Sequence, residues 1–189
     1  MKTPAHHPTT AERTFVARLE RLVERGDRGT LAALRRGLGD RGGGFETLLA
    51  LGRLLPEEVS EHDERTFTRL GALFASTTGG HRTRGQPPGD LGASLGRLVA
   101  IRSEASVRPR FLALVGTAET DLDPHLRRVV ALLDSDGIGI DWAQLLHDLR
   151  AWNHPERVVQ RRWSRSFARS LVPLSDGDAD REPASEGDA

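Results

Sequence analysis

Cysteine is absent from all 189 residues of the chain. Without a thiol the protein can form no disulfide framework, no thiolate zinc site and no cysteine nucleophile. That composition fits a reducing compartment, and we expect the protein in the cytoplasm. Long apolar runs are missing as well. None approaches the ~20 residues that span a bilayer, and residues 1–10 lack the hydrophobic core of a signal peptide, so we expect no membrane contact.

Groupings of residues that carry catalytic or metal chemistry are also missing. Residues 134–139 (DSDGIG) have the start of a calcium loop, but the position that requires a bidentate glutamate is Leu145. The histidines are scattered, and His125 and His147 are expected on helix surfaces. The glycines at 42–44 follow no strand, which argues against a nucleotide loop. We therefore expect no enzymatic activity, no catalytic residue, no metal site and no cofactor.

Lysine is nearly absent, whereas arginine is abundant. Lys2 is the only lysine among 27 basic residues, so 26 are arginine. A GC-rich genome explains most of that ratio, but it does not decide where the arginines lie. From Ser175 onward the chain has six acidic residues and one basic residue, which leaves 26 basic and 21 acidic residues over 1–174, a body of about +5. We expect 175–189 to be a disordered acidic tail. Its acidic residues are Asp176, Asp178, Asp180, Glu182, Glu186 and Asp188.

Apolar residues recur with helical spacing in every ordered stretch, and no stretch shows the two-residue alternation of a strand. The sequence predicts an all-α fold of roughly eight to nine helices, arranged as two small bundles joined by a long loop. We expect an N-terminal helical subdomain at 1–75, a glycine- and proline-rich basic loop at 76–92, and a C-terminal helical subdomain at 93–174. The basic residues of the loop are His81, Arg82 and Arg84.

Capping residues predict where several helices begin. Three pairs are typical of helix N-termini: Thr9 with Glu12, Asp123 with Pro124, and Asp141 with Gln144. Phe45 to Leu55 is expected to form a helix that ends before Pro56. Pro155 is expected to start the last helix, which runs to about Leu171.

Arginines on this last helix recur every four residues. An apolar series with the same spacing is offset by two residues, about 200° around a helix, so the two series are expected on opposite faces. Like charges at this spacing destabilise an isolated helix, and a solvated face normally mixes signs. An anionic partner is therefore the most economical explanation. The apolar series is Val159, Trp163, Phe167 and Leu171; the arginines are Arg157, Arg161, Arg165 and Arg169, with Arg162 beside them.

Further arginines point away from apolar stripes on other predicted helices. Taken singly, each is more typical of an ordinary surface, but together they form a basic surface suited to phosphate. The tryptophans and most phenylalanines fall on apolar stripes and are expected in the core, which leaves few rings to stack on bases. Binding should therefore depend on backbone and shape rather than base sequence. These arginines are Arg35, Arg36, Arg97, Arg127 and Arg128.

An ordered set of short motifs resembles one known family, the small subunit of the type I-E CRISPR Cascade complex (the CasB family). The resemblance covers about residues 12–171, and its most specific portion is 94–152. Each motif alone is short, and the order and spacing carry the likeness. The motifs are Ser94-Leu95-Gly96-Arg97, Arg110-Phe111, Leu126-Arg127-Arg128, and Ile140-Asp141-Trp142 followed by Leu145 and Trp152, with Leu34-Arg35-Arg36 and Phe45 onward as a weaker N-terminal part.

The resemblance implies an all-helical protein without enzymatic activity. It also implies that the partners are guide CRISPR RNA, target DNA, the backbone and large subunits of Cascade, and a second copy of the chain. The basic surface of the family supports the target strand and the displaced strand of the R-loop. By position, Arg97, Arg110, Arg127 and Arg128 inherit that role. The acidic tail and the glycines near Gly42 depart from the family pattern, and nothing is transferred to them.

Two other functions remain open on the residues alone. A helical DNA-binding regulator would need a tight three-helix unit, and the turn at 134–141 is too long for one. A protein–protein adaptor unrelated to CRISPR would use its helix faces for protein contacts and would show no salt-sensitive affinity for nucleic acid.

Overall fold

The computed structural model describes residues 7–38, 44–57, 59–77 and 89–171. Within these ranges the chain forms helices and no strand. The predicted all-α class, with eight to nine helices, is therefore confirmed. None of the helices described is long and apolar enough to cross a membrane.

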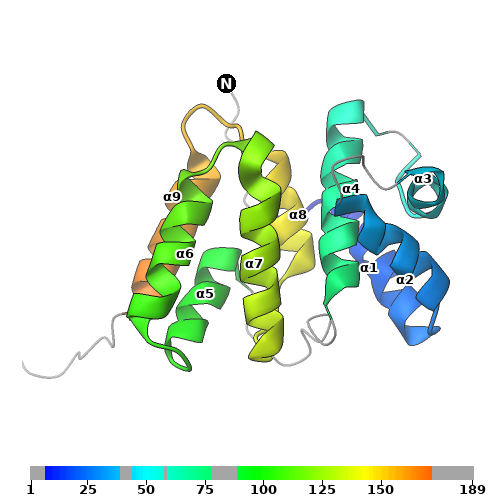
Figure 1. The fold of residues 1–189 in the computed structure, drawn as a ribbon. Coiled ribbons are helices and arrows are strands. Elements are labelled where there is room, and N and C mark those ends of the chain that lie inside the picture. Colours follow the sequence, from blue (N-terminus) through cyan, green and yellow to red (C-terminus); the bar gives the residue numbers. More distant parts are fainter. Residues whose placement is uncertain (1–6, 39–43, 58, 78–88, 172–189) are drawn as a thin grey trace, which may run out of the picture.

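Helices α1 to α4 form one group and α5 to α9 the other (Figure 1). The groups meet where α4 packs against α7 and α8, and where α1 packs against α8. One buried apolar cluster runs through both groups, from Phe15 on α1 to Phe167 on α9. The helices are α1 Thr10–Glu24, α2 Arg28–Arg35, α3 Gly44–Gly52, α4 Glu61–Ser76, α5 Leu91–Val99, α6 Glu104–Gly116, α7 Leu122–Ser135, α8 Trp142–Arg150 and α9 Val158–Leu171, with 3₁₀ turns at Arg36–Leu38 and Glu119–Asp121.

Two predicted N-caps are confirmed. Thr9 and Glu12 form a complete capping box at α1. Asp141 accepts from the Gln144 backbone N–H at 2.9 Å, but the Gln144 side chain donates to Asp148 at 2.7 Å instead of returning to the cap. The box predicted at Asp141 is therefore only half formed, because a buried carboxylate one turn later competes for the amide.

Three predicted helix ends are wrong by two or three residues. Helix α7 begins at Leu122 with Asp121 at its N-cap, so Asp123 lies in the first turn. Helix α3 ends at Gly52, before Leu55. Helix α9 begins at Val158 rather than Pro155. In the last case Arg157 has a φ of 50°, a left-handed conformation that cannot belong to a regular helix.

The predicted subdomain boundaries stay predictions. Helix α4 ends at Ser76 and α5 begins at Leu91, so both ends of the predicted loop are close to those expected. His81, Arg82, Arg84 and the acidic tail lie outside the described residues.

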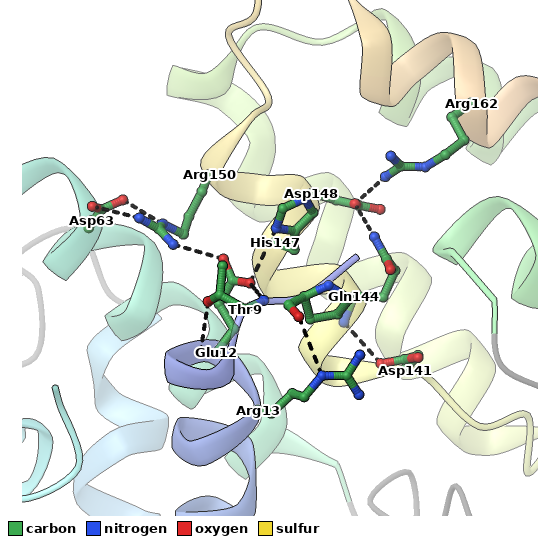
Figure 2. A network of polar contacts seen from close by, with 11 residues as sticks. Thr9, Glu12, Arg13, Asp63, Asp141, Gln144, His147, Asp148, Arg150 and Arg162 are labelled. Atoms are coloured by element: carbon green, nitrogen blue, oxygen red, sulfur yellow. Dashed lines mark hydrogen bonds and ion pairs between the residues drawn. The ribbon is translucent and has the colours of Figure 1, made fainter. Parts of the chain in front are cut away.

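Charged side chains join the two groups of helices inside the fold (Figure 2). Arg150 on α8 makes a two-pronged contact with Asp63 of α4, at 2.7 and 3.0 Å. It also donates to Glu12 of α1 at 2.8 Å. Nδ1 of His147 lies 3.2 Å from the other oxygen of Glu12. The side chain of His147 is only 12% exposed, so its predicted place on the helix surface is wrong.

Glu12 is fully buried, and its surroundings stabilise its charged form. Burial opposes ionisation, but hydrogen bonds from His147, the Thr9 backbone and Arg150 outweigh burial and lower the pKa of Glu12 to about 2. The pKa of Asp63 is also lowered, mainly by its hydrogen bonds from Arg150. Ionised Glu12 therefore contributes stability above its ordinary pKa of 4.5, and that contribution is lost as pH falls toward 2.

We expect Glu12→Gln to lower the free energy of unfolding at pH 7 by about 2 kcal/mol, because it removes a charged acceptor from Arg150. The difference from wild type should shrink as pH falls from 4.5 to about 2. Urea unfolding across this range measures both effects. Exposed Glu24, changed to Gln, is the control and should stay within ~0.5 kcal/mol of wild type. If Glu12→Gln lowered the free energy of unfolding by the same amount at every pH, the lowered pKa of Glu12 would be contradicted.

Candidate nucleic-acid interface

Helix α9 carries its charges and its apolar residues on opposite faces, as its sequence predicts. Val159, Trp163 and Phe167 are buried in the core. Arg161, Arg165 and Arg169 are exposed, and no side-chain partner for them is found in the part of the chain that the structure describes. These three residues are called the α9 arginine face below. They rise along the helix in steps of ~6 Å, four residues at a time.

Polar contacts of inward-facing residues fix the rotation of α9. The indole N–H of Trp163 donates to Asp148 at 2.6 Å. The side-chain amide of Gln160 donates to the backbone carbonyl of Trp152 at 2.9 Å, and the Ser166 hydroxyl lies 2.8 Å from a carboxylate oxygen of Asp90. Each contact needs its donor on the inner side of α9. The arginine face is thereby held outward.

Two glycines of α5 let α9 approach very closely. A methyl group built on Gly92 would lie 2.8 Å from Cα of Trp163 and closer still to its carbonyl oxygen. One built on Gly96 would overlap the Ser170 side chain. Only glycine, which has no Cβ atom, leaves room for such close contact between two helices.

An open groove of about 660 Å³ lies between α6 and α9, beside the arginine face. Its walls combine apolar residues of α6 with the basic side of α9. Leu112 of α6 is 54% exposed here. The residues that line the groove include Leu112, Val115, Gln160, Arg161, Ser164 and Arg165.

Two of the predicted site arginines cover the ends of other helices. Arg35 donates through Nε and Nη2 to the carbonyl of Ala75, at 2.8 and 2.6 Å, near the end of α4. Arg157 donates to the carbonyl of Val115 at 2.6 Å, near the end of α6. Such carbonyls have no partner within their own helix. Arg157 precedes α9, so it is not a member of the helical series predicted for it.

Four further candidates contact protein groups. Arg36 pairs with Glu46, and Arg110 donates to Ser106 one turn before it. Arg97 is half-buried and donates to the Ser94 hydroxyl at 2.9 Å; burial lowers the pKa of its guanidinium, against the influence of Asp90. The last is Arg162, which faces inward to Asp148 and Asp90, with Nε 3.6 Å from the Asp90 carboxylate.

Arg127 and Arg128 complete the predicted set. Both are exposed on α7, and neither has a side-chain partner among the described residues. Helix α6 packs against both α7 and α9. Among the predicted site arginines, the structure thus leaves two groups without a described partner, one on α7 and one on α9.

Comparison with known proteins identifies the family. A family model described as CRISPR-associated protein Cse2 matches residues 30–167. The chain belongs to the Cse2 family. A Cse2 protein of Thermus thermophilus is 35% identical over 145 residues, which are 72% of this chain and 76% of that protein. The predicted resemblance to the CasB family, the small subunit of type I-E Cascade, is confirmed.

Solved structures of Cse2 relatives have the same fold. CasB of M. ruber superposes with a TM-score of 0.70 at 30% identity, covering 86% of this chain and 94% of that one. A chain of a CRISPR RNA-guided surveillance complex superposes with a TM-score of 0.69 at 29% identity, covering 85% and 92%.

Sequence reasoning missed the buried charges of this Cse2 protein. Asp148 and Glu12 are fully buried, yet each lies on a helix whose local pattern gives no sign of it. The arginines that pair with them, Arg162 for Asp148 and Arg150 for Glu12, are 14 and 138 residues away. Within the described ranges, no three acidic or histidine side chains are arranged to hold a metal ion.

We expect Gly92→Ala to lower the free energy of unfolding by about 2–3 kcal/mol, since α5 and α9 must separate to admit the methyl group. Gly52→Ala is the matched control. A methyl group at Gly52 would have nothing within 4 Å, so this change should be neutral or slightly stabilising. Thermal and urea unfolding measure both. Equal stability of the two variants would show that α5 and α9 are not held by close contact.

Proposed function

We propose that this protein is the non-catalytic small subunit of a Cascade-type, CRISPR RNA-guided surveillance complex. The observation that carries the proposal is membership of the Cse2 family, together with a likeness across 85% of the chain to a subunit of such a complex. In this role the α9 arginine face binds nucleic-acid backbone and stabilises the R-loop.

The charge of the α9 arginine face supports backbone binding. Three guanidinium groups on one helix face, without described carboxylate partners, form a site of positive potential. Guanidinium forks match pairs of phosphate oxygens and do not need a particular base. All three tryptophans are buried, so they cannot stack on bases. Such a surface binds phosphate without selecting a sequence.

The remaining predicted arginines differ in the contacts that each would have to break in order to bind phosphate. Arg127 and Arg128 can contact phosphate without breaking a described contact, and we assign them a supporting role. Arg36 and Arg110 would each have to exchange an exposed contact for phosphate, which costs little. Arg35 and Arg157 would have to release helix carbonyls. Arg97 is half-buried, and Arg162 would have to leave the carboxylates of Asp90 and Asp148. Those four act mainly by shaping the surface.

A weak backbone contact has a large effect where an equilibrium is nearly balanced. Opening a target duplex against a guide RNA exchanges one duplex for another of similar stability, so a few backbone contacts change its extent. The proposed partners are guide CRISPR RNA, target DNA, the backbone and large subunits, and a second copy of this chain. Base pairing in the guide supplies the sequence specificity that this subunit lacks.

We expect the protein to bind single-stranded nucleic acid of any sequence, with an affinity that falls steeply with salt. Replacing Arg161, Arg165 and Arg169 with alanine should lower the log–log salt slope by roughly 0.7 for each phosphate that the variant no longer binds. Fluorescence anisotropy with two unrelated oligonucleotides measures the slopes. The control replaces exposed Arg21, Arg25 and Arg28 with alanine, which removes the same charge far from α9. If both triple variants lowered the salt slope equally, net charge alone would explain the effect and the α9 arginine face would have no special role.

Within the assembled complex, we expect omission of this subunit to leave guide RNA bound while stable opening of the target duplex declines. The α9 triple variant should reproduce much of this decline without changing which sequences are opened. Footprinting of matched and mismatched duplexes measures both properties. Undiminished opening would favour a protein adaptor, and a changed sequence preference would favour a base-reading regulator.

A further inference from the structure

The groove between α6 and α9 has one apolar side and one cationic side. On α6, Leu112 and Val115 are three residues apart and therefore share a face of the helix. Both line the groove, and Leu112 is more than half exposed to solvent there. On α9, Arg161 and Arg165 line the other side, about one helical turn apart. A ligand in the groove therefore meets apolar groups and positive charge at the same time.

Two contacts between these helices fix the spacing on which the groove depends. Arg157, just before α9, donates to the carbonyl of Val115 near the end of α6, at 2.6 Å. Toward the other end of α9, the rings of Phe111 and Phe167 stack with their centroids 4.3 Å apart. Because the start of α9 meets the end of α6, the two helices run antiparallel (Figure 1). The helices are thus held together at two separate levels, which sets the width of the groove.

The size and charge of the groove suit a nucleotide. Its volume of about 660 Å³ is within the range of roughly 300–1,000 Å³ that small-ligand sites have. A nucleobase has an apolar face that packs against aliphatic side chains, and the phosphates that flank it need cations. Arg161 and Arg165 are separated by ~6 Å along the helix, which successive phosphates of an extended strand can match. Glu156 is the one carboxylate among the lining residues, and it lies before the start of α9, away from Arg165.

We propose that this groove binds one unpaired base of a single strand, with the base against Leu112 and Val115 and its flanking phosphates on Arg161 and Arg165. The inference rests on the proposed function and names the form of nucleic acid that the subunit binds. A base in a duplex is stacked and paired, and taking it out costs free energy, so a duplex offers this groove only its phosphates. The side chains of leucine and valine have no hydrogen-bonding group, so the site accepts any base.

Methyl NMR on the full chain tests where the base lies. The probes are a short oligothymidylate and the same strand with abasic sugars, which keeps the phosphates and lacks the rings. The ring current of a base above Leu112 and Val115 should shift their methyl proton signals upfield with oligothymidylate and not with the abasic strand. Both strands should shift the side-chain N–H signals of Arg161 and Arg165, because both carry phosphates.

Affinities of the same two strands test what the base contributes. Wild type should bind oligothymidylate about fivefold more tightly than the abasic strand, which is the lower end of what one stacked base contributes. Leu112→Asn should remove most of this ratio and leave binding of the abasic strand unchanged. The matched control is Leu48→Asn, since Leu48 is 51% exposed on α3, at the opposite end of the molecule (Figure 1). This control should keep the wild-type ratio, and fluorescence anisotropy measures all three proteins.

The possible outcomes separate this site from the proposed function. If both strands bind equally well and shift only the arginine signals, the base site is overturned while backbone binding stands. If neither strand binds, the proposed function fails and the base site fails with it. A ratio that falls equally in Leu112→Asn and Leu48→Asn would also overturn the site. If Leu112→Asn keeps the ratio but weakens assembly of the complex, the groove belongs to a protein partner and the proposal is wrong.

Discussion

Buried charge on helix α8 holds the two groups of helices together. Asp148 and Arg150 are two residues apart, about 200° around the helix, so they point to opposite sides. Arg150 reaches Asp63 of α4 and Glu12 of α1, while Asp148 accepts from Trp163 and Arg162 of α9. Removing charges from water is costly, and apolar residues of similar size can be equally stabilising. What these contacts add is orientation: each fixes how another helix is rotated against α8.

The rotation of α9 follows from this constraint. Burial raises the pKa of Asp148, and contacts from Arg162, Trp163 and Gln144 oppose that rise. The two oxygens of Asp148 accept from Trp163 and Arg162, which places both of these residues on the inner side of α9. Once those residues face inward, the helical repeat leaves Arg161, Arg165 and Arg169 no direction but outward. Gly92 then allows α5 to close on the inner side. The basic face is in this sense a consequence of core packing.

Sequence periodicity was sufficient for the helices and for the two faces of α9, because both depend on neighbours within one turn. The Thr9–Glu12 box and the buried series Val159, Trp163 and Phe167 are local patterns of this kind. The start of α9 was missed because Arg157 is held by Val115, 42 residues earlier. Likewise, the local sequence does not show that Arg162 meets two distant carboxylates, whereas Arg161 meets none that is described.

The arginines of this chain have different structural roles, and their positions distinguish these roles better than their number does. Arg18, Arg35 and Arg157 donate to carbonyls near helix ends, a need that every helix has. Arginines of this kind follow from helical architecture in a lysine-poor chain and imply no ligand. The α9 face is different, since its like charges repel each other along the helix and no contact within the described fold offsets that repulsion. Repulsion that folding leaves in place is relieved when an anion binds. The physical case for a polyanionic partner therefore depends on three arginines and not on the 26 that the composition offers.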